Sequence, residues 1–183
     1  MPRIIAGSAR GTRLRTLKGN VLRPTYDRVK ETMFNVLGPM GGLLVLDLFA
    51  GTGSLGIEAL SRGAERAVFV EKRREAARLV RENLMKCRLE ERARVVVGPC
   101  DREIGALAAS GDRFDLVMLD PPYGKSLASV CVSRLVAEDL VAEEGRIIVE
   151  HGRDEAIEPE GDGLSMLDRR TIGSTALSIF RVW

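Results

Sequence analysis

The chain has 183 residues, of which 45% are hydrophobic, enough for one domain with its own core and a small appendage. No apolar run approaches the ~20 residues of a membrane span, and the N-terminal sequence lacks the apolar centre of a signal peptide. The single histidine, His151, and three cysteines without metal-like spacing argue against a zinc site and a Ser-His-Asp triad. We therefore expect a cytoplasmic protein with reduced thiols, no metal and no membrane contact.

The net charge of +2 conceals a strongly basic N-terminal segment. Residues 1–30 hold eight lysines and arginines against a single acid, Asp27, which leaves the rest of the chain net acidic. Such a segment can be a polyanion-binding arm or simply a well-solvated surface, and composition alone favours neither. The basic residues are Arg3, Arg10, Arg13, Arg15, Lys18, Arg23, Arg28 and Lys30.

Two short strands at residues 2–6 and 12–17 are predicted around Gly7 and Gly11. They form a basic β-hairpin extension, which we assign to residues 1–22. The alternation of side chains in the second strand places Arg13 and Arg15 on one face.

An amphipathic helix is predicted next, from Thr25 to the Gly38-Pro39 pair that ends it. Its apolar face carries Val29, Met33 and Leu37. This helix opens the main domain, which we assign to residues 23–183.

From residue 43 onward, apolar strands alternate with helices. The predicted strands are 43–49, 66–71, 93–97, 114–120 and 145–150, and the predicted helices are 54–62, 73–88, 102–109 and 127–138. Strands joined through helices form right-handed βαβ units and a parallel sheet. Residues 164–171 and 176–183 alternate instead, which predicts an antiparallel C-terminal hairpin. The expected fold is therefore α/β and Rossmann-like, with a mostly parallel seven-stranded sheet.

The loop after the first of these strands has the glycine spacing of a dinucleotide-binding fingerprint, Gly51-x-Gly53-x-x-Gly56. Asp47, just ahead of it, is an unfavourable neighbour for a pyrophosphate, because an unpaired carboxylate would repel it. S-adenosylmethionine has no phosphate and carries a sulfonium and an ammonium group, which Asp47 could attract directly or through water. Asp47 could also cap the loop backbone, and the two roles are compatible.

Two more acids follow strands of the same sheet. Glu71 ends the strand 66–71, where a carboxylate can accept both hydroxyls of a ribose. Asp101 follows the strand 93–97 and could bind the adenine amino group or act as the N-cap of the next helix. Cys100 lies near the cofactor by adjacency alone.

The sharpest motif is 120-DPPY-123, directly after a buried strand. Methylation of an exocyclic amine requires a carboxylate and a carbonyl that orient the amine, which Asp120 and Pro121 supply. Pro122 helps to stiffen the loop, and Tyr123 offers a flat face to a base extruded from its stack. The same four residues alone would be interpreted as a rigid turn, but the glycine loop and Glu71 favour the catalytic interpretation.

These residues together resemble a class I S-adenosylmethionine-dependent amino-methyltransferase. The segments 7-GSARGTRL-14, 23-RPTYDRV-29 and 44-LVLDLFAGTGSLGIEALSRGA-64 resemble the bacterial 16S ribosomal RNA guanine-N2 methyltransferase family, and the resemblance covers almost the whole chain. It implies methyl transfer to the 2-amino group of one guanine, within a ribosomal assembly particle.

The resemblance also implies site residues. Cofactor binding would involve Thr25, Asp47, Phe49, Ala50, Gly51, Thr52, Gly53, Glu71 and Asp101, with Arg23 and Pro24 as neighbouring candidates. The target amine would be held by Asp120, Pro121, Pro122 and Tyr123. RNA phosphates would be met by Arg3, Arg10, Arg13, Arg15, Lys18, Arg23 and Arg28. Many relatives have Tyr-Gly-x-Thr near the last hairpin, whereas this chain has 172-IGST-175, which we interpret as the loss of a surface or packing aromatic.

Three alternatives compete with this interpretation. A DNA or RNA adenine-N6 or cytosine-N4 methyltransferase uses a similar motif, but 183 residues leave no room for a DNA target-recognition region. A nicotinamide-dependent reductase is disfavoured by Asp47 and by the absence of a second βαβ half. A non-catalytic RNA-binding assembly factor would bind particles without turnover. No oligomerisation segment is evident, so we expect a monomer, and we interpret His151 as a solvent-facing strand end.

Overall fold

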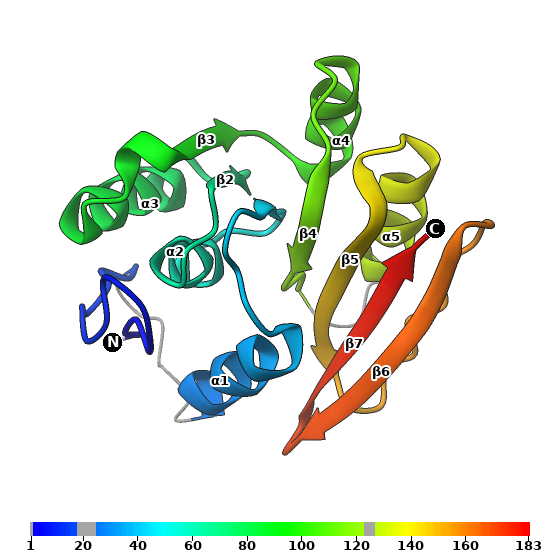
Figure 1. Ribbon diagram of the computed structural model, residues 1–183, viewed down its shortest axis with the longest axis horizontal. Helices are drawn as coiled ribbons and strands as arrows, with labels where there is room; N and C mark the ends of the chain where they lie inside the picture. Colours follow the sequence, from blue (N-terminus) through cyan, green and yellow to red (C-terminus); the bar gives the residue numbers. More distant parts are fainter. Residues whose placement is uncertain (1, 18–24, 123–126) are drawn as a thin grey trace.

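The computed structural model describes residues 2–17, 25–122 and 127–183. From residue 25 onward the described chain alternates between helices and strands (Figure 1). The helices are α1 (Thr25–Leu37), α2 (Ser54–Ser61), α3 (Arg74–Cys87), α4 (Cys100–Ala109) and α5 (Leu127–Ala137), and the short 3-10 helix η1 (Glu90–Arg92) follows α3. The strands are β1 (Leu44–Asp47), β2 (Arg66–Glu71), β3 (Ala93–Val97), β4 (Phe114–Leu119), β5 (Val141–Gly152), β6 (Leu164–Ile172) and β7 (Thr175–Val182).

Within the described residues, seven strands form one sheet in the order β3-β2-β1-β4-β5-β7-β6. Strands β1 to β5 run parallel, and β7 lies antiparallel between β5 and β6. The predicted parallel sheet with an antiparallel C-terminal hairpin is confirmed. The strand order reverses between β1 and β4, which is the position where ligands bind in sheets of this kind.

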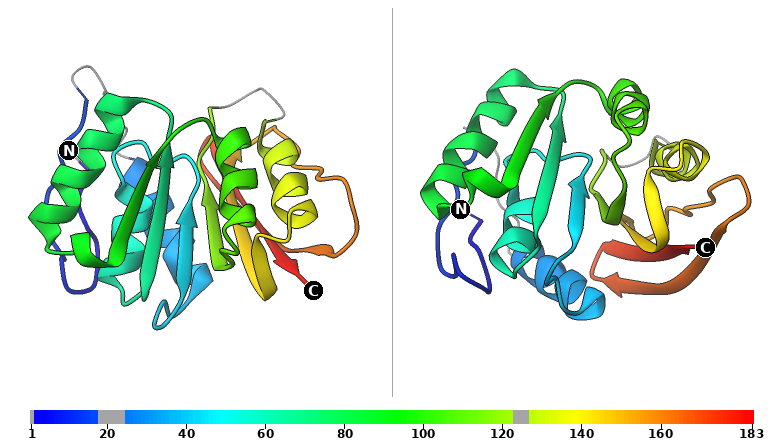
Figure 2. Two further views of the ribbon diagram at one scale, coloured as in Figure 1. Left: turned by 90° about the horizontal axis from the view of Figure 1, so that it is seen from above. Right: turned by 45° about the horizontal axis from the view of Figure 1, so that its top comes forward.

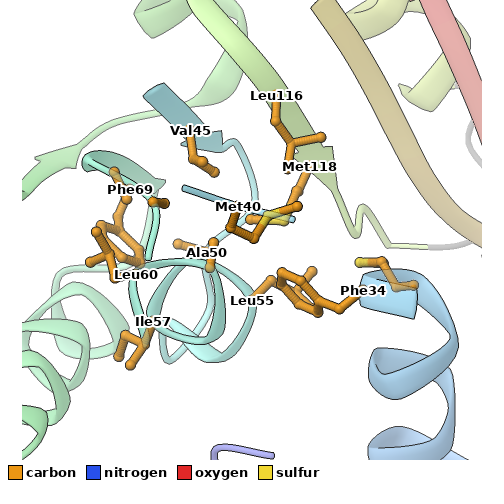
Figure 3. Packing of buried hydrophobic residues seen from close by; sticks show 14 of the residues in the cluster. Phe34, Met40, Val45, Ala50, Leu55, Ile57, Leu60, Phe69, Leu116 and Met118 are labelled. Carbon is orange, nitrogen blue, oxygen red and sulfur yellow. The ribbon is translucent and has the colours of Figure 1, made fainter. Parts of the chain in front are cut away.

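Helices cover both faces of the sheet (Figures 1 and 2). α1, α2 and α3 share one hydrophobic cluster with the sheet, and α4 and α5 share a second. In the first cluster, Phe69 of β2 and Met118 of β4 lie among side chains from the helical layer, such as Phe34 and Leu60 (Figure 3). Burial on both faces explains why the parallel strands are almost continuously apolar in sequence.

Two strands differ from their predicted bounds by more than one residue. The segment predicted as strand 43–49 pairs only over Leu44–Asp47, because the chain then turns into the glycine loop. Strand β5 begins at Val141 rather than at 145, since Val141 pairs with Phe114 ahead of a shift in the β4–β5 register. Glu144 has a positive φ of 64° within this irregular stretch, a conformation that a sequence pattern does not reveal.

The N-terminal segment, residues 2–17, is here called the arm. The prediction of two regular strands in it is wrong, although its two halves do run antiparallel and form a bridge between Arg3 and Arg13. The backbone N–H groups of Ile5 and Ala6 donate to the Glu58 carboxylate, at 2.8 and 3.0 Å. These donors therefore anchor the arm to helix α2, while Ile4 N–H donates across the arm to the Thr12 carbonyl.

The arm is packed against helices α2 and α3. Ile4 and Leu14 are buried in the same hydrophobic cluster as these helices. Gly7 approaches α2 so closely that a Cβ atom there would lie 1.8 Å from the Ser61 carbonyl oxygen. The assigned boundary between residues 22 and 23 lies outside the described residues. Among the described residues, no helix combines the length and apolar character needed to cross a membrane.

Candidate active site

A cavity of about 860 Å³ opens at the carboxyl ends of β1, β2, β3 and β4. One part of its wall comes from the β1–α2 loop and the end of β2, and another from the segment that follows β4. It is lined by Leu48, Phe49, Gly51, Val70, Glu71, Lys72, Arg73, Gly98, Pro99, Cys100, Asp120, Pro121, Pro122 and Leu127. The glycine loop, the predicted ribose-binding acid and the described part of the DPPY motif therefore meet at one cavity.

Each glycine of the fingerprint has a distinct structural role. Gly51 and Gly53 have positive φ values of 55° and 86°, and Gly53 is the N-cap residue of α2. A Cβ atom on Gly56 would lie 2.3 Å from the Phe69 ring, so the third glycine allows α2 to pack closely on β2. The loop thereby keeps its backbone at the cavity wall, and the N-terminus of α2 begins near the carboxyl ends of the parallel strands.

Asp47 is buried beneath this loop and does not line the cavity. Its Oδ2 atom accepts a hydrogen bond of 2.9 Å from the backbone N–H of Gly56. Burial raises the pKa of Asp47 to about 7, Gly56 opposes that shift, and the nearby charges of Asp120 and Glu71 add to it. The backbone-capping role left open by the sequence is present, and a direct contact with a cofactor stays a prediction.

Glu71 lines the cavity and holds the glycine loop in place. Its Oε2 atom accepts from the backbone N–H of Gly51 at 2.9 Å, while Oε1 accepts from the backbone N–H of Arg73 at 2.8 Å. The Arg73 guanidinium also contacts Oε1, at 3.3 Å. Because an ionised carboxylate oxygen accepts about two hydrogen bonds, Oε2 retains capacity for a ligand hydroxyl.

Asp120 lies at the carboxyl end of β4, in the cavity wall. Burial raises the pKa of its carboxyl group to about 6. Pro121 is buried and Pro122 is exposed, and both line the cavity. Tyr123, predicted to stack on the base, lies outside the described residues.

The remaining predicted cofactor residues occupy varied positions. Ala50 donates its N–H to the carbonyl of Val70, and the carbonyl of Thr52 accepts from the side chain of Asn83. Asp101 is exposed in the first turn of α4 and does not line the cavity. The N-cap position of α4 belongs to Pro99, so Asp101 does not have the alternative N-cap role. Nothing is described for the side chain of Thr25 or for residues 23 and 24.

The basic side chains of the arm do not all point freely into solvent. Arg3 pairs with Asp27 at 3.1 Å, and Arg15 pairs with Glu82 at 2.6 Å. Arg10, Arg13 and Arg28 are exposed, and no ion pair joins them to another of the described residues. Lys18 and Arg23 lie outside the described residues. The exposed pairs are weak enough in water to exchange for phosphate contacts.

Lys30 is the exception to the picture of a solvated basic segment. Its side chain is 1% exposed, and its Nζ atom lies 3.2 Å from Glu58 Oε2, a carboxylate with 0% exposure. Nζ also donates to the Arg3 carbonyl and to Ser54 Oγ, at 2.6 and 3.2 Å. Burial lowers the pKa of Lys30, and Glu58 opposes that shift. In sequence, Lys30 stands three and seven positions before Met33 and Leu37, which places it on the apolar face of α1.

Known proteins share this architecture over nearly the whole chain. Residues 2–181 match the family model described as Conserved hypothetical protein 95. Ribosomal RNA small subunit methyltransferase D of Haemophilus influenzae is 36% identical over 181 residues, which cover 98% of this chain and 93% of that protein. The protein of the same name from Escherichia coli is 33% identical over 180 residues, covering 98% and 89%. The chain belongs to this methyltransferase D family.

Solved structures agree with the family assignment. The Escherichia coli protein yhhF superposes with a TM-score of 0.84 at 32% identity, covering 98% of this chain and 97% of that chain. A hypothetical protein from Thermus thermophilus superposes with a TM-score of 0.80 at 34% identity, with 97% of each chain covered. The predicted class I methyltransferase fold and the predicted family are confirmed.

For this member of the methyltransferase D family, the interpretation of His151 as a solvent-facing residue is wrong. Strand β5 continues to Gly152 and pairs with β7, so His151 is covered and only 1% exposed. Its Nδ1 atom lies 2.9 Å from the Gly152 carbonyl oxygen and its Nε2 atom 2.9 Å from Ser178 Oγ. Burial lowers the pKa of this ring, which therefore stays neutral, donates from Nδ1 and accepts at Nε2.

Sequence reasoning missed several residues of the site. Four cavity residues simply follow the ends of β2 and β3, namely Lys72, Arg73, Gly98 and Pro99. The ends of the predicted strands were the signal that could have identified them. Asn83, on α3, connects the arm to the glycine loop, and no motif marks it. Ile172 is partly buried against the first hydrophobic cluster, which agrees with a packing role for the aromatic residue it replaces.

Proposed function

We propose that the protein transfers a methyl group from S-adenosylmethionine to the exocyclic 2-amino group of a guanine in 16S ribosomal RNA, on an assembled or assembling small subunit. The observation that carries this proposal is the half-buried Asp120, followed by two prolines, in the wall of the cavity that also contains the glycine loop and Glu71. The names of the family relatives, which specify small-subunit ribosomal RNA, support the choice of substrate.

The carboxyl groups at and beneath the glycine loop fit a cationic ligand better than a phosphorylated one. Asp47, Glu71 and Asp120 lie close enough that the latter two raise the pKa of Asp47. A pyrophosphate would add negative charge to this cluster, whereas a cation would relieve it. We assign Phe49, Gly51 and Glu71 to cofactor contact, with Asp47 acting from beneath the loop. When bound, S-adenosylmethionine supplies a methyl group on a positively charged sulfur.

Asp120 orients the acceptor. At pH 7.5 its carboxyl group is mostly ionised, since its pKa is about 6, and it can accept a hydrogen bond from the exocyclic amine. This hydrogen bond orients the amine so that its nitrogen lone pair is less delocalised into the base ring. The two prolines restrict the backbone that follows Asp120. The nitrogen becomes positively charged as its new bond to carbon forms, and the nearby carboxylate stabilises that charge before a proton is released.

The arm is the proposed contact for the RNA backbone. Arg10, Arg13 and Arg28 present exposed guanidinium groups, which suit phosphate oxygens. Their positions are set by the contacts of the arm with α2 and α3. We expect the protein to bind as a monomer.

The test is methyl transfer from isotopically labelled S-adenosylmethionine to small-subunit particles that lack the modification, followed by digestion to nucleosides. We expect labelled N2-methylguanosine. Two controls accompany the test: already modified particles should remain unlabelled, and the Asp120→Asn protein should transfer at least about a hundredfold less label. Labelled N6-methyladenosine or N4-methylcytidine would identify a different acceptor base and contradict the proposal. Binding to the particles without methyl transfer would favour an assembly factor.

A further inference from the structure

Two cysteines from different helices face each other beside the cavity. Cys100 is the first residue of α4, and Cys131 lies in the middle of α5. Their Sγ atoms are 3.8 Å apart although the residues are separated by 31 positions. Cys131 is 3% exposed within the second hydrophobic cluster, whereas Cys100 is half-buried. The packing of α4 against α5 therefore brings one accessible and one protected thiol together.

The pair connects two parts of the cavity wall. Cys100 lines the cavity together with Gly98 and Pro99, after β3. Leu127, the first residue of α5, also lines it. Because Cys131 follows Leu127 by four positions, both lie on the same face of α5. A bond between the sulfur atoms would thus tie the β3–α4 wall to the helix that carries Leu127.

The surroundings of Cys100 favour its thiolate. A hydrogen bond from the Cys131 thiol to the ionised Cys100 sulfur lowers the pKa of Cys100 to about 7. Burial and the Asp101 carboxylate act in the opposite direction, and the backbone N–H of Asp101 assists the lowering of the pKa. Position at the N-terminus of a ten-residue helix has the same sign of effect. The pKa of Cys131 is raised, because its proton is held by Cys100 and its site is buried.

We propose that Cys100 and Cys131 form a reversible disulfide on exposure to hydrogen peroxide, and that this bond closes the cavity to the cofactor. The second part rests on the proposed function, which identifies the ligand of the cavity. Cys100 is the reactive thiol, and Cys131 is the thiol that completes the bond.

The chemistry balances with peroxide as the oxidant. The Cys100 thiolate attacks one peroxide oxygen, the O–O bond breaks, and sulfenic acid and hydroxide form. The Cys131 sulfur then attacks the Cys100 sulfur, forms the S–S bond and displaces the hydroxyl group as water. Two thiols lose two electrons and two protons, and one peroxide becomes two waters.

The bond requires movement of the wall. Sulfur atoms in a disulfide are about 2.05 Å apart, so the present separation of 3.8 Å must shorten. Cys131 is packed inside the core, whereas Cys100 begins its helix at the cavity edge. The first turn of α4 therefore moves toward α5, and the lining at Gly98 to Cys100 moves with it.

The experiment oxidises the reduced full-length protein with hydrogen peroxide, maps its peptides by mass spectrometry and measures S-adenosylhomocysteine affinity by calorimetry. We expect a peptide pair linked through Cys100 and Cys131. The affinity for S-adenosylhomocysteine should fall by about tenfold or more, and dithiothreitol should restore it fully. Saturation with S-adenosylhomocysteine before oxidation should slow the reaction, because the ligand covers Cys100.

Variants separate the proposal from general oxidative damage. Cys131→Ser should stop at a sulfenic acid on Cys100, trapped by dimedone, and should retain its affinity. Cys131→Ala serves the same purpose if the serine variant does not fold. Cys87→Ala removes the cysteine of α3, in the other hydrophobic cluster, and should behave like the parent protein.

Peptide maps without the Cys100–Cys131 link, or a linked protein with unchanged affinity, would overturn the proposal. If the reduced protein did not bind S-adenosylhomocysteine at all, the proposed function and the regulatory consequence would both fail. The disulfide assignment would still be decided by the peptide map alone, so the two failures are distinguishable.

Discussion

Two carboxyl groups with raised pKa values give the site its electrostatic character. Burial raises the pKa of Asp47 to about 7 and that of Asp120 to about 6. Each group therefore changes its charge near neutral pH, where a surface aspartate would remain ionised. Asp120 lines the cavity and can contact an acceptor, whereas Asp47 lies below the glycine loop and acts on it through Gly56.

The first prediction separates the role of Asp120 from cofactor binding. Asp120→Asn keeps the shape of the side chain and removes its negative charge, so we expect methyl transfer to fall by at least about a hundredfold. The affinity for S-adenosylhomocysteine should change by less than about tenfold. Single-turnover rates and calorimetry measure the two effects. Retention of turnover would contradict the assignment of Asp120 to the acceptor.

A second prediction concerns pH and the stability of the fold. An ordinary aspartate has a pKa of 3.8, whereas the pKa of Asp47 in the folded protein is about 7. The folded state therefore holds this proton more tightly than the unfolded state does. Its contribution to stability is complete below pH ~4 and is lost as the pH rises to about 7. Asp47→Asn removes this dependence and keeps an oxygen that can accept from Gly56.

We therefore expect the free energy of unfolding of Asp47→Asn, relative to that of the parent protein, to increase as the pH rises from 4 to 8, by no more than about 4 kcal/mol. It should also bind S-adenosylhomocysteine less tightly at pH 8. Thermal unfolding of both proteins across this range measures the difference. A difference that does not vary with pH would show that Asp47 titrates normally.

At the scale of elements, helix α2 depends on how closely it approaches β2. Gly56 sits where an added methyl group would meet the Phe69 ring at 2.3 Å, in the hydrophobic cluster shared by the helix and the sheet. We predict that Gly56→Ala destabilises the protein by about 1–3 kcal/mol through overpacking, as measured by chemical denaturation.

Gly105→Ala is the matched control for this prediction. Gly105 lies inside α4, and its added methyl group would meet only the end of the Arg134 side chain, at 3.3 Å. Alanine should therefore stabilise this helix, by about 0.5–1 kcal/mol. Equal effects of the two substitutions would contradict the close-packing role of Gly56.

The elements also differ in how well their patterns predict them. Helix α3 has a strong apolar stripe with Ala77, Val80 and Leu84, and its predicted bounds agree with the structure within one residue at each end. The arm has a clear pattern of a different kind, the alternation typical of a strand, but it forms no regular strands. The difference is tertiary, because the arm is anchored to Glu58, about fifty residues later in the chain, which accepts from the N–H groups of Ile5 and Ala6.

At the scale of the whole molecule, the arm is joined to the cofactor loop through buried polar side chains. Asn83 accepts from the Arg15 N–H at 2.7 Å and donates to the Arg15 and Thr52 carbonyls, at 3.1 and 2.9 Å. Lys30 makes a second connection, from the Arg3 carbonyl to Ser54 Oγ. The proposed RNA contact is thus held in a fixed position beside the glycine loop.

The corresponding prediction concerns RNA affinity. Replacing Arg10 and Arg13 with glutamine should weaken binding to small-subunit RNA and reduce the slope of log affinity against log salt by about 1–2. Arg113→Gln with Arg181→Gln changes the net charge equally at the amino-terminal ends of the parallel strands, where Arg113 precedes β4 and Arg181 pairs with Arg146 of β5. Binding measured from low to moderate salt should be little affected in this control. Equal slopes for the two double variants would remove the arm from the RNA surface.

By itself, the sequence determined the α/β class, the parallel strands, the C-terminal hairpin and the residues that gather at the sheet edge. These features follow from the local hydrophobic periodicity, which repeats every few residues, and from the positions where predicted strands end. Only the tertiary structure decided that Lys30 is buried with Glu58, that His151 is covered by β7, and that Asp47 faces Gly56. A side chain's charge state and partners depend on what long-range packing places around it, and no short pattern contains that information.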